Sequence, residues 1–176
     1  MTMMVQTSTD EVPELLDLIE HRRANGLDTF DEWWQGVYRI VTGPSPEHGE
    51  LVLRLGALLL ELCRRAGLDA AAPVNIGIDK SDARVSDIAV YRPNTERTSP
   101  AFLRTAELVV EILSPGERAG EKLPFYAEWG VREYLEVDLA RGAVRLLANR
   151  DGTWEPADVS AVVELTVDEV TSLLDT

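Results

Sequence analysis

The sequence predicts one domain of the mixed α/β class, which some schemes would call α+β. Its 176 residues are enough for one full hydrophobic core and too few for two ordinary domains. Segments with helical spacing of apolar residues are interspersed with short apolar runs typical of strands. The sequence contains no internal repeat, low-complexity tract or interdomain linker. We therefore expect a single domain over residues 1–176, with residues 1–27 as an N-terminal helical extension.

The N-terminal part is predicted to be helical before the first strand. Glu11–Arg23 carries apolar side chains at roughly helical spacing and is followed by Asn25-Gly26, a helix stop. A second short helical turn is expected at Phe30–Trp34. Val37–Val41 then alternates as an opening strand does.

The best-defined element is a long helix from about Pro46 to Ala66. Ser45 is a suitable N-cap, Pro46 fits the first helical position, and Gly67 fits the end. One face of this helix is apolar, so we expect it to pack on the sheet; its members are Leu51, Val52, Leu55, Leu58, Leu59, Leu62 and Cys63.

Strands are expected in the middle of the chain. Val74–Ile78, a polar turn at residues 79–82 and the run Val85–Tyr91 together predict a hairpin. A polar loop at residues 92–100, which contains proline, leads to the strand Leu108–Leu113.

The C-terminal part continues with alternating helices and strands. A helix is expected from about Gly120 to Trp129, followed by the strands Glu133–Asp138 and Ala143–Ala148. A short strand at Ala161–Leu165 precedes a last helix, where the spacing of Thr166 and Glu169 fits a capping box.

Asp87 and Glu111 are the most informative residues, because each lies in a run that otherwise reads as a buried strand. A carboxylate there must be protonated, paired or bound to a metal ion, since burying it bare is costly. The structural alternative is that core arginines or backbone donors neutralise both carboxylates. Two such residues on strands that could be adjacent favour oxygen ligands for a hard divalent cation such as Mg²⁺.

The net charge and the counts of cysteine and histidine restrict the classes of function that the chain could have. The net charge of −14 argues against non-specific coating of nucleic acid, which relies on Lys and Arg, although a local basic cleft is still compatible with it. A lone cysteine, Cys63, is compatible with a reducing cytoplasm, and no signal-peptide or membrane-spanning pattern is present, so a cytoplasmic location is expected. The chain has no glycine-rich phosphate loop, and its two histidines are too few for most zinc centres.

Four segments in a fixed order resemble the Uma family of restriction endonuclease-like proteins, a branch of the PD-(D/E)XK nuclease superfamily. They are Pro44–His48, Val85–Val90, Val110–Pro115 and Glu121–Tyr134. Each segment alone is a weak signal, but the ordered set is fairly specific. The resemblance implies a mixed central sheet flanked by helices, as in restriction endonucleases.

The resemblance also implies a metal-dependent endonuclease acting on nucleic acid, with DNA more expected than RNA. Asp87 and Glu111 would be the ligands of Mg²⁺ or Mn²⁺, and both would be catalytic. The superfamily usually places a lysine two positions after the second carboxylate, where this chain has Leu113. Family members of this type supply it from the following helix, which maps onto Lys122; a merely solvated lysine is the alternative.

Two further residues are candidates for the same site. His48 matches a family histidine in the first turn of the long helix, although a capping or surface role fits equally well. Glu32 lies in a segment similar to an early family motif and would complete the acidic cluster. The chain departs from the family pattern at Ser86, Leu135 and Glu136.

A second hypothesis is a catalytically silent binding or assembly protein on a nuclease scaffold, motivated by the acidic surface and the missing strand lysine. A homodimer is also compatible with the first hypothesis, because cutting two strands with one site per chain favours two-fold symmetry.

Overall fold

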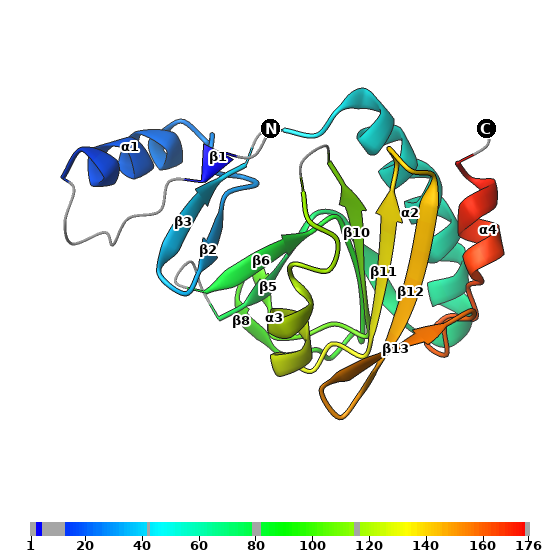
Figure 1. Ribbon diagram of the computed structural model, residues 1–176. Coiled ribbons are helices and arrows are strands. Elements are labelled where there is room, and N and C mark those ends of the chain that lie inside the picture. The colour runs from blue at the N-terminus through cyan, green and yellow to red at the C-terminus, as the bar shows by residue number, and fades with distance from the viewer. Residues whose placement is uncertain (1–2, 5–12, 42, 79–81, 115–116, 175–176) are drawn as a thin grey trace.

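The computed structural model describes residues 3–4, 13–41, 43–78, 82–114 and 117–174, and their strands form two mixed sheets (Figure 1). The six-stranded sheet has the order β13-β12-β11-β10-β7-β4. Its strands are β4 (Asp69–Ala71), β7 (Ile88–Tyr91), β10 (Leu108–Leu113), β11 (Glu133–Asp138), β12 (Ala143–Arg150) and β13 (Thr153–Ala157). Only β10 and β11 pair in parallel within it.

The second sheet has seven strands in the order β1-β3-β2-β6-β5-β9-β8. They are β1 (Met3–Met4), β2 (Glu32–Trp34), β3 (Val37–Ile40), β5 (Val74–Gly77), β6 (Ala83–Ser86), β8 (Arg97–Ser99) and β9 (Phe102–Leu103). The described helices are α1 (Pro13–Ala24), α2 (Pro46–Ala66), α3 (Leu123–Glu128) and α4 (Val167–Ser172). No described helix has the length and apolar character needed to cross a membrane.

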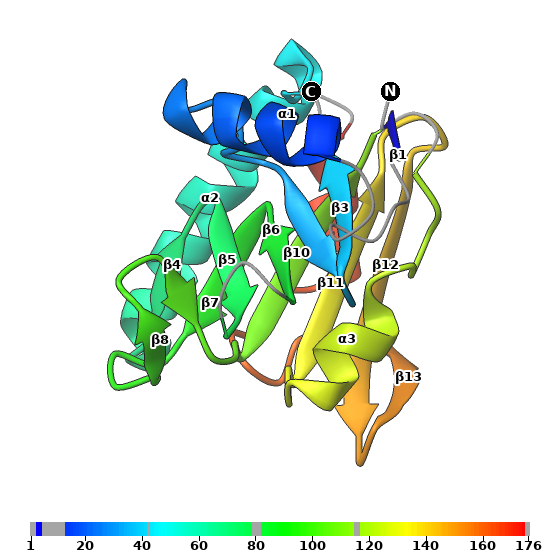
Figure 2. The same ribbon diagram turned by 90° about the vertical axis from the view of Figure 1, so that its left-hand side faces the viewer.

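Helices α2 and α4 pack on one face of the six-stranded sheet, while α3 lies on the opposite face (Figure 1, Figure 2). Alternate residues of β10 point to opposite faces, as the strand period requires. Val110 packs in the core under α2, whereas Val109 packs in the core under α3. Glu111 shares the parity of Val109, so its side chain lies on the α3 face.

The long helix α2 has the predicted bounds and caps. Ser45 Oγ accepts the backbone N–H of His48 at 3.3 Å, and Gly67 closes the helix in the left-handed region at φ +67°. Leu51, Leu55 and Leu59 are buried against the sheet. The Ser45 cap fixes where the helix begins, and His48 is therefore held in its first turn.

The expected hairpin is present, but the strand through Asp87 is divided. β5 and β6 pair antiparallel, with Val74 opposite Ser86. The chain then bends at Asp87, and β7 leaves for the other sheet, where Val110 lies opposite Ile88. Asp87 thus marks the point at which one continuous chain passes between the two sheets. The polar turn at residues 79–81 lies outside the described residues.

Two local expectations were wrong. Phe30–Trp34 is not a helical turn, because Glu32–Trp34 forms β2 and pairs with β3 through a two-residue turn. Both turn residues, Gln35 and Gly36, have positive φ, which suits a tight hairpin. Ala161–Leu165 is not a strand, because residues 161–163 form a turn and residues 164–165 have no regular structure. The strand β13, which was not expected, lies before this segment and is an exposed edge strand that contains a proline.

The remaining differences are in boundaries. Helix α3 begins at Leu123, three residues later than the expected Gly120, and Lys122 immediately precedes it. The loop expected at residues 92–100 contains the short strand β8. The expected Glu11–Arg23 helix begins within the described residues at Pro13.

Candidate active site

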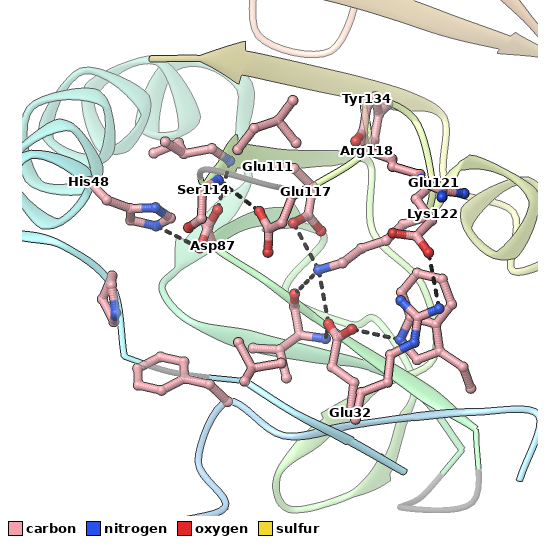
Figure 3. A pocket seen from close by; sticks show the side chains of 18 residues that line it. Glu32, His48, Asp87, Glu111, Ser114, Glu117, Arg118, Glu121, Lys122 and Tyr134 are labelled. Carbon is pink, nitrogen blue, oxygen red and sulfur yellow. Dashed lines mark hydrogen bonds and ion pairs between the residues drawn. The ribbon is translucent and has the colours of Figure 1, made fainter. Parts of the chain in front are cut away.

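A pocket with a volume of about 270 Å³ opens beside the bend at Asp87 and the C-terminal half of β10. Figure 3 shows His48 reaching it from α2, Glu111 from β10 and Lys122 from the segment leading into α3. Its ionisable lining residues are Glu32, Arg39, His48, Asp87, Glu111, Glu117, Arg118, Glu121, Lys122 and Tyr134. All five site residues predicted from the sequence therefore line one pocket.

Asp87 is accessible from this pocket, because 24 % of its side chain is exposed. Its Oδ2 accepts the backbone N–H of Ile112 at 2.7 Å, and its Oδ1 lies 2.9 Å from His48 Nε2. The expectation of a buried strand position was wrong for this residue, since the bend turns the carboxylate toward the pocket. The expected adjacency of its strand to that of Glu111 is confirmed by the pairing of β7 with β10.

His48 contacts Asp87 from the first turn of α2 (Figure 3). Burial lowers the pKa of the imidazole, but the hydrogen bond and negative charge of Asp87 outweigh it, and the net shift is upward. The side chain of His48 is therefore neither a helix cap nor a surface group. It is placed to hold the Asp87 carboxylate.

Glu111 is the buried carboxylate of the pair, with 7 % of the residue exposed. Tyr126 donates its hydroxyl proton to Oε1, and Lys122 Nζ lies 2.9 Å from Oε2. Burial raises the pKa of the Glu111 carboxyl to about 8, with Lys122 opposing the rise and Asp87 adding to it. The influence of Asp87 on this pKa shows that the two carboxylates share one electrostatic environment.

Lys122 points back to Glu111 from the residue before α3 (Figure 3). Besides Glu111, its Nζ contacts Glu32 Oε1 at 2.9 Å and the carbonyl oxygen of Val85 at 2.8 Å. Burial alone would lower the pKa of this ammonium, but the two glutamates outweigh burial and raise it. Lys122 therefore carries a fixed positive charge in the pocket, unlike a solvated surface lysine.

Glu32 joins the site from β2, in the sheet that does not contain Glu111. Its Oε1 also accepts the backbone N–H of Val85 at 2.8 Å, and its Oε2 accepts Trp34 Nε1–H at 2.6 Å. With these donors and Lys122, both oxygens are partnered. Glu32 thus positions Lys122 and ties the two sheets together at the pocket.

Tyr126 is a site residue that the sequence reasoning did not single out. It is fully buried on α3, four residues after Lys122, and its hydroxyl binds the same carboxylate. Residues four apart lie on one side of a helix, so this spacing was the available signal. Because Lys122 and Tyr126 both contact Glu111, the start of α3 is anchored directly on β10.

Glu136 explains how the segment before α3 is held. Its Oε2 accepts the backbone N–H of Gly120 at 2.6 Å and the hydroxyl of Tyr134 at 2.9 Å, while its Oε1 pairs with Arg145 at 2.7 Å. Gly120 has φ +69°, and a Cβ there would lie 2.8 Å from Leu123. Glu136, which departs from the family pattern, is therefore a buried residue that holds Gly120, two residues before Lys122.

Asp87 and Glu111 are the residues suited to hold a metal ion. Continuing the register of β7 and β10 by one residue would place Asp87 opposite Glu111. Among the described residues, no three His, Cys, Asp or Glu side chains form a ready group for a metal ion. Mg²⁺ is commonly held by one or two carboxylates together with water and substrate phosphates, so this pair fits that cation.

The two-sheet α/β fold and a pocket combining two carboxylates with a lysine define the restriction-endonuclease-like class. The family model described as "Uma2: Putative restriction endonuclease" matches residues 13–174, and the chain belongs to this family. A solved structure, a putative nuclease belonging to DUF820 from Anabaena variabilis, is similar with a TM-score of 0.65 and 16% identity. The match covers 82% of this chain and 90% of that one, and it establishes the fold. No curated protein matches the chain.

Proposed function

We propose that this protein is a metal-dependent endonuclease that hydrolyses phosphodiester bonds, with DNA as its substrate in preference to RNA. The observation that carries the proposal is the convergence of Asp87, Glu111 and Lys122 on one pocket. Membership of a family described as restriction endonucleases supports both the reaction and the choice of DNA.

The two carboxylates would hold Mg²⁺ or Mn²⁺ at the pocket. When bound, such an ion polarises the phosphoryl group and lowers the pKa of an attacking water. Asp87 is oriented by the Ile112 N–H, and Glu111 is oriented by Tyr126. These contacts hold both carboxyl groups beside the pocket.

Lys122 would stabilise the negative charge that develops on the phosphoryl oxygens in the transition state. Its ammonium is fixed by Glu32, Glu111 and the Val85 carbonyl, so its position does not depend on substrate. His48 donates its Nε2–H to the Asp87 carboxylate and would hold this ligand in place.

The test is cleavage of supercoiled plasmid and of structured RNA by the purified protein with Mg²⁺, Mn²⁺ or a chelator. We expect metal-dependent nicking of DNA that is lost in Asp87→Asn and in Glu111→Gln. Glu107→Gln is the matched control, because Glu107 is a paired carboxylate outside the pocket. Equal nicking by all variants would indicate a contaminating nuclease. Inactivity of the wild type on both substrates would favour the silent binding protein.

Cleavage of both strands of a duplex would require two sites, so we also expect a homodimer on DNA. Sedimentation of the protein with a DNA duplex in Ca²⁺ would measure the stoichiometry. Two chains per duplex is the expected result, and one chain would mean that the enzyme nicks single strands.

A further inference from the structure

Arg39 occupies a distinctive place in the pocket wall. It lies on β3 directly opposite Glu32 of β2, and cross-strand partners project from the same face of a sheet. Its guanidinium carbon lies 3.3 Å from the centre of the Trp34 ring, and only 15 % of the side chain is exposed. Among the described residues, its one ionic partner is Glu121 on the pocket rim, at 3.0 Å.

The stacking fixes the guanidinium in space. Arg84 covers the Trp34 ring at 4.2 Å, and the same Arg84 lies 4.1 Å from the centre of Phe125. Trp34 is therefore in contact with two guanidinium groups, and its Nε1–H is bound by Glu32. An arginine mounted in this way loses little conformational entropy when it binds a ligand.

Lys122 and His48, two of the other cations in the pocket, are committed to the protein, whereas Arg118 is exposed at its edge. An ammonium group has three donors, and Lys122 already has three oxygen acceptors at 2.8–2.9 Å. His48 is paired with Asp87. In contrast, Arg39 Nε is buried and has no hydrogen-bond partner among the described residues, so this guanidinium retains unused donor capacity.

A nucleic-acid strand needs such a cation here. The chain has a net charge of −14, and the pocket contains the carboxylates of Glu32 and Asp87, which repel a phosphate. A planar guanidinium fork is the side chain best matched to phosphate oxygens.

We propose that Arg39 binds a non-bridging oxygen of a backbone phosphate in the substrate strand, and that Glu121 pairs with the guanidinium when no strand is bound. This inference rests on the proposed nuclease function and adds the residue that holds the strand. Glu121 is suited to leave, because 34 % of its side chain is exposed and an exposed ion pair is weak.

The test measures binding of a short fluorescein-labelled DNA duplex by anisotropy in Ca²⁺, with gels confirming that the probe stays intact. Arg39→Gln should weaken binding by roughly tenfold to a hundredfold, the range of a charged hydrogen bond. The slope of log affinity against log salt should fall in magnitude by about 0.9, the value for one lost phosphate contact. Arg39→Gln should keep the rise in melting temperature that Mn²⁺ is expected to cause in the wild type.

Glu121→Gln should have the opposite effect and tighten binding by roughly two- to fivefold, the worth of one exposed ion pair. This gain should vanish in the Arg39→Gln background, because the competition that Glu121 exerts is then gone. Opposite signs from the two variants would not arise from a merely structural role. Since Glu121 is on the rim, its variant also tests the proposal if Arg39→Gln folds poorly.

The chain offers matched controls. Arg104 lies over the ring of Trp129 at 5.1 Å with Glu96 at 3.9 Å, which repeats the arrangement outside the pocket lining. Arg104→Gln and Glu96→Gln change the net charge equally and should have much smaller effects. If Arg39→Gln matches Arg104→Gln while the wild type binds and cleaves DNA, this inference falls and the proposed function stands. If the wild type neither binds nor cleaves nucleic acid, both fall.

Discussion

Lys122 Nζ lies 2.9 Å from Glu111 Oε2, although the lysine is eleven residues further along the chain and outside the strand. The position two residues after Glu111 holds Leu113, which lines the same pocket. The ammonium reaches the carboxylate from the segment before α3, which Glu136 clamps through Gly120. The positive charge that a lysine at position 113 of β10 could supply thus reaches Glu111 Oε2 from the segment before α3.

Lys122→Gln should therefore separate chemistry from metal binding. Removing a fixed donor to the developing charge should lower the cleavage rate by about 10²- to 10³-fold. The Mn²⁺-induced rise in melting temperature should be unchanged or larger, because a positive charge beside the two ligands is lost. Single-turnover cleavage and thermal unfolding measure the two effects. Loss of both in a folded variant would mean that Lys122 organises the whole pocket.

Metal binding itself should depend on both carboxylates. A cation that binds only the folded protein stabilises it by about 2.7 kcal/mol at a hundred times its dissociation constant. Mn²⁺ should raise the melting temperature of the wild type and of Glu107→Gln, but not that of Asp87→Asn or Glu111→Gln. A shift that persists in both site variants would place the metal elsewhere.

Metal affinity should rise with pH through the titration of Glu111. Its pKa is raised to about 8, so the carboxyl is protonated below that pH and must lose a proton before it can bind a cation. Apparent Mn²⁺ affinity should fall by about tenfold for each pH unit below 8. Tyr126→Phe removes a hydrogen bond that lowers this pKa, so the midpoint should move upward. Isothermal titration of both proteins across pH checks this, and identical midpoints would contradict it.

Away from the site, Glu107 should make stability fall in acid. Burial raises the pKa of this carboxyl, but Arg92 and Arg132 outweigh burial, and the net shift is downward. A lowered folded pKa means that the stabilisation is present above the ordinary value of 4.5 and is lost as pH falls below it. Urea midpoints of Glu107→Gln should depend less on pH in that range. The effect should be small and salt-sensitive, because both arginines are more than half exposed. Parallel pH curves for the two proteins would show that these ion pairs contribute nothing.

The elements that the sequence predicted well are those set by short-range forces. Leu108–Leu113 and Glu133–Asp138 are strands with the expected bounds, because each is an apolar run of strand length. The helix Pro46–Ala66 was defined by its caps and its apolar face. The prediction was wrong where the conformation of a tight turn set the structure. At Gln35-Gly36, two positive φ values form a hairpin turn next to a segment that was expected to be helical.

The sequence by itself determined the candidate carboxylates, because Asp87 and Glu111 are conspicuous in apolar surroundings and are costly to bury unpaired. Only the tertiary structure decided what they face. The bend at Asp87 carries the chain from one sheet to the other, and Glu32 comes to within 2.9 Å of Lys122 across that junction. Periodicity and caps act over a few residues and specify which face of an element is buried. They do not specify which distant element covers that face, and the pocket is made from such long-range pairings.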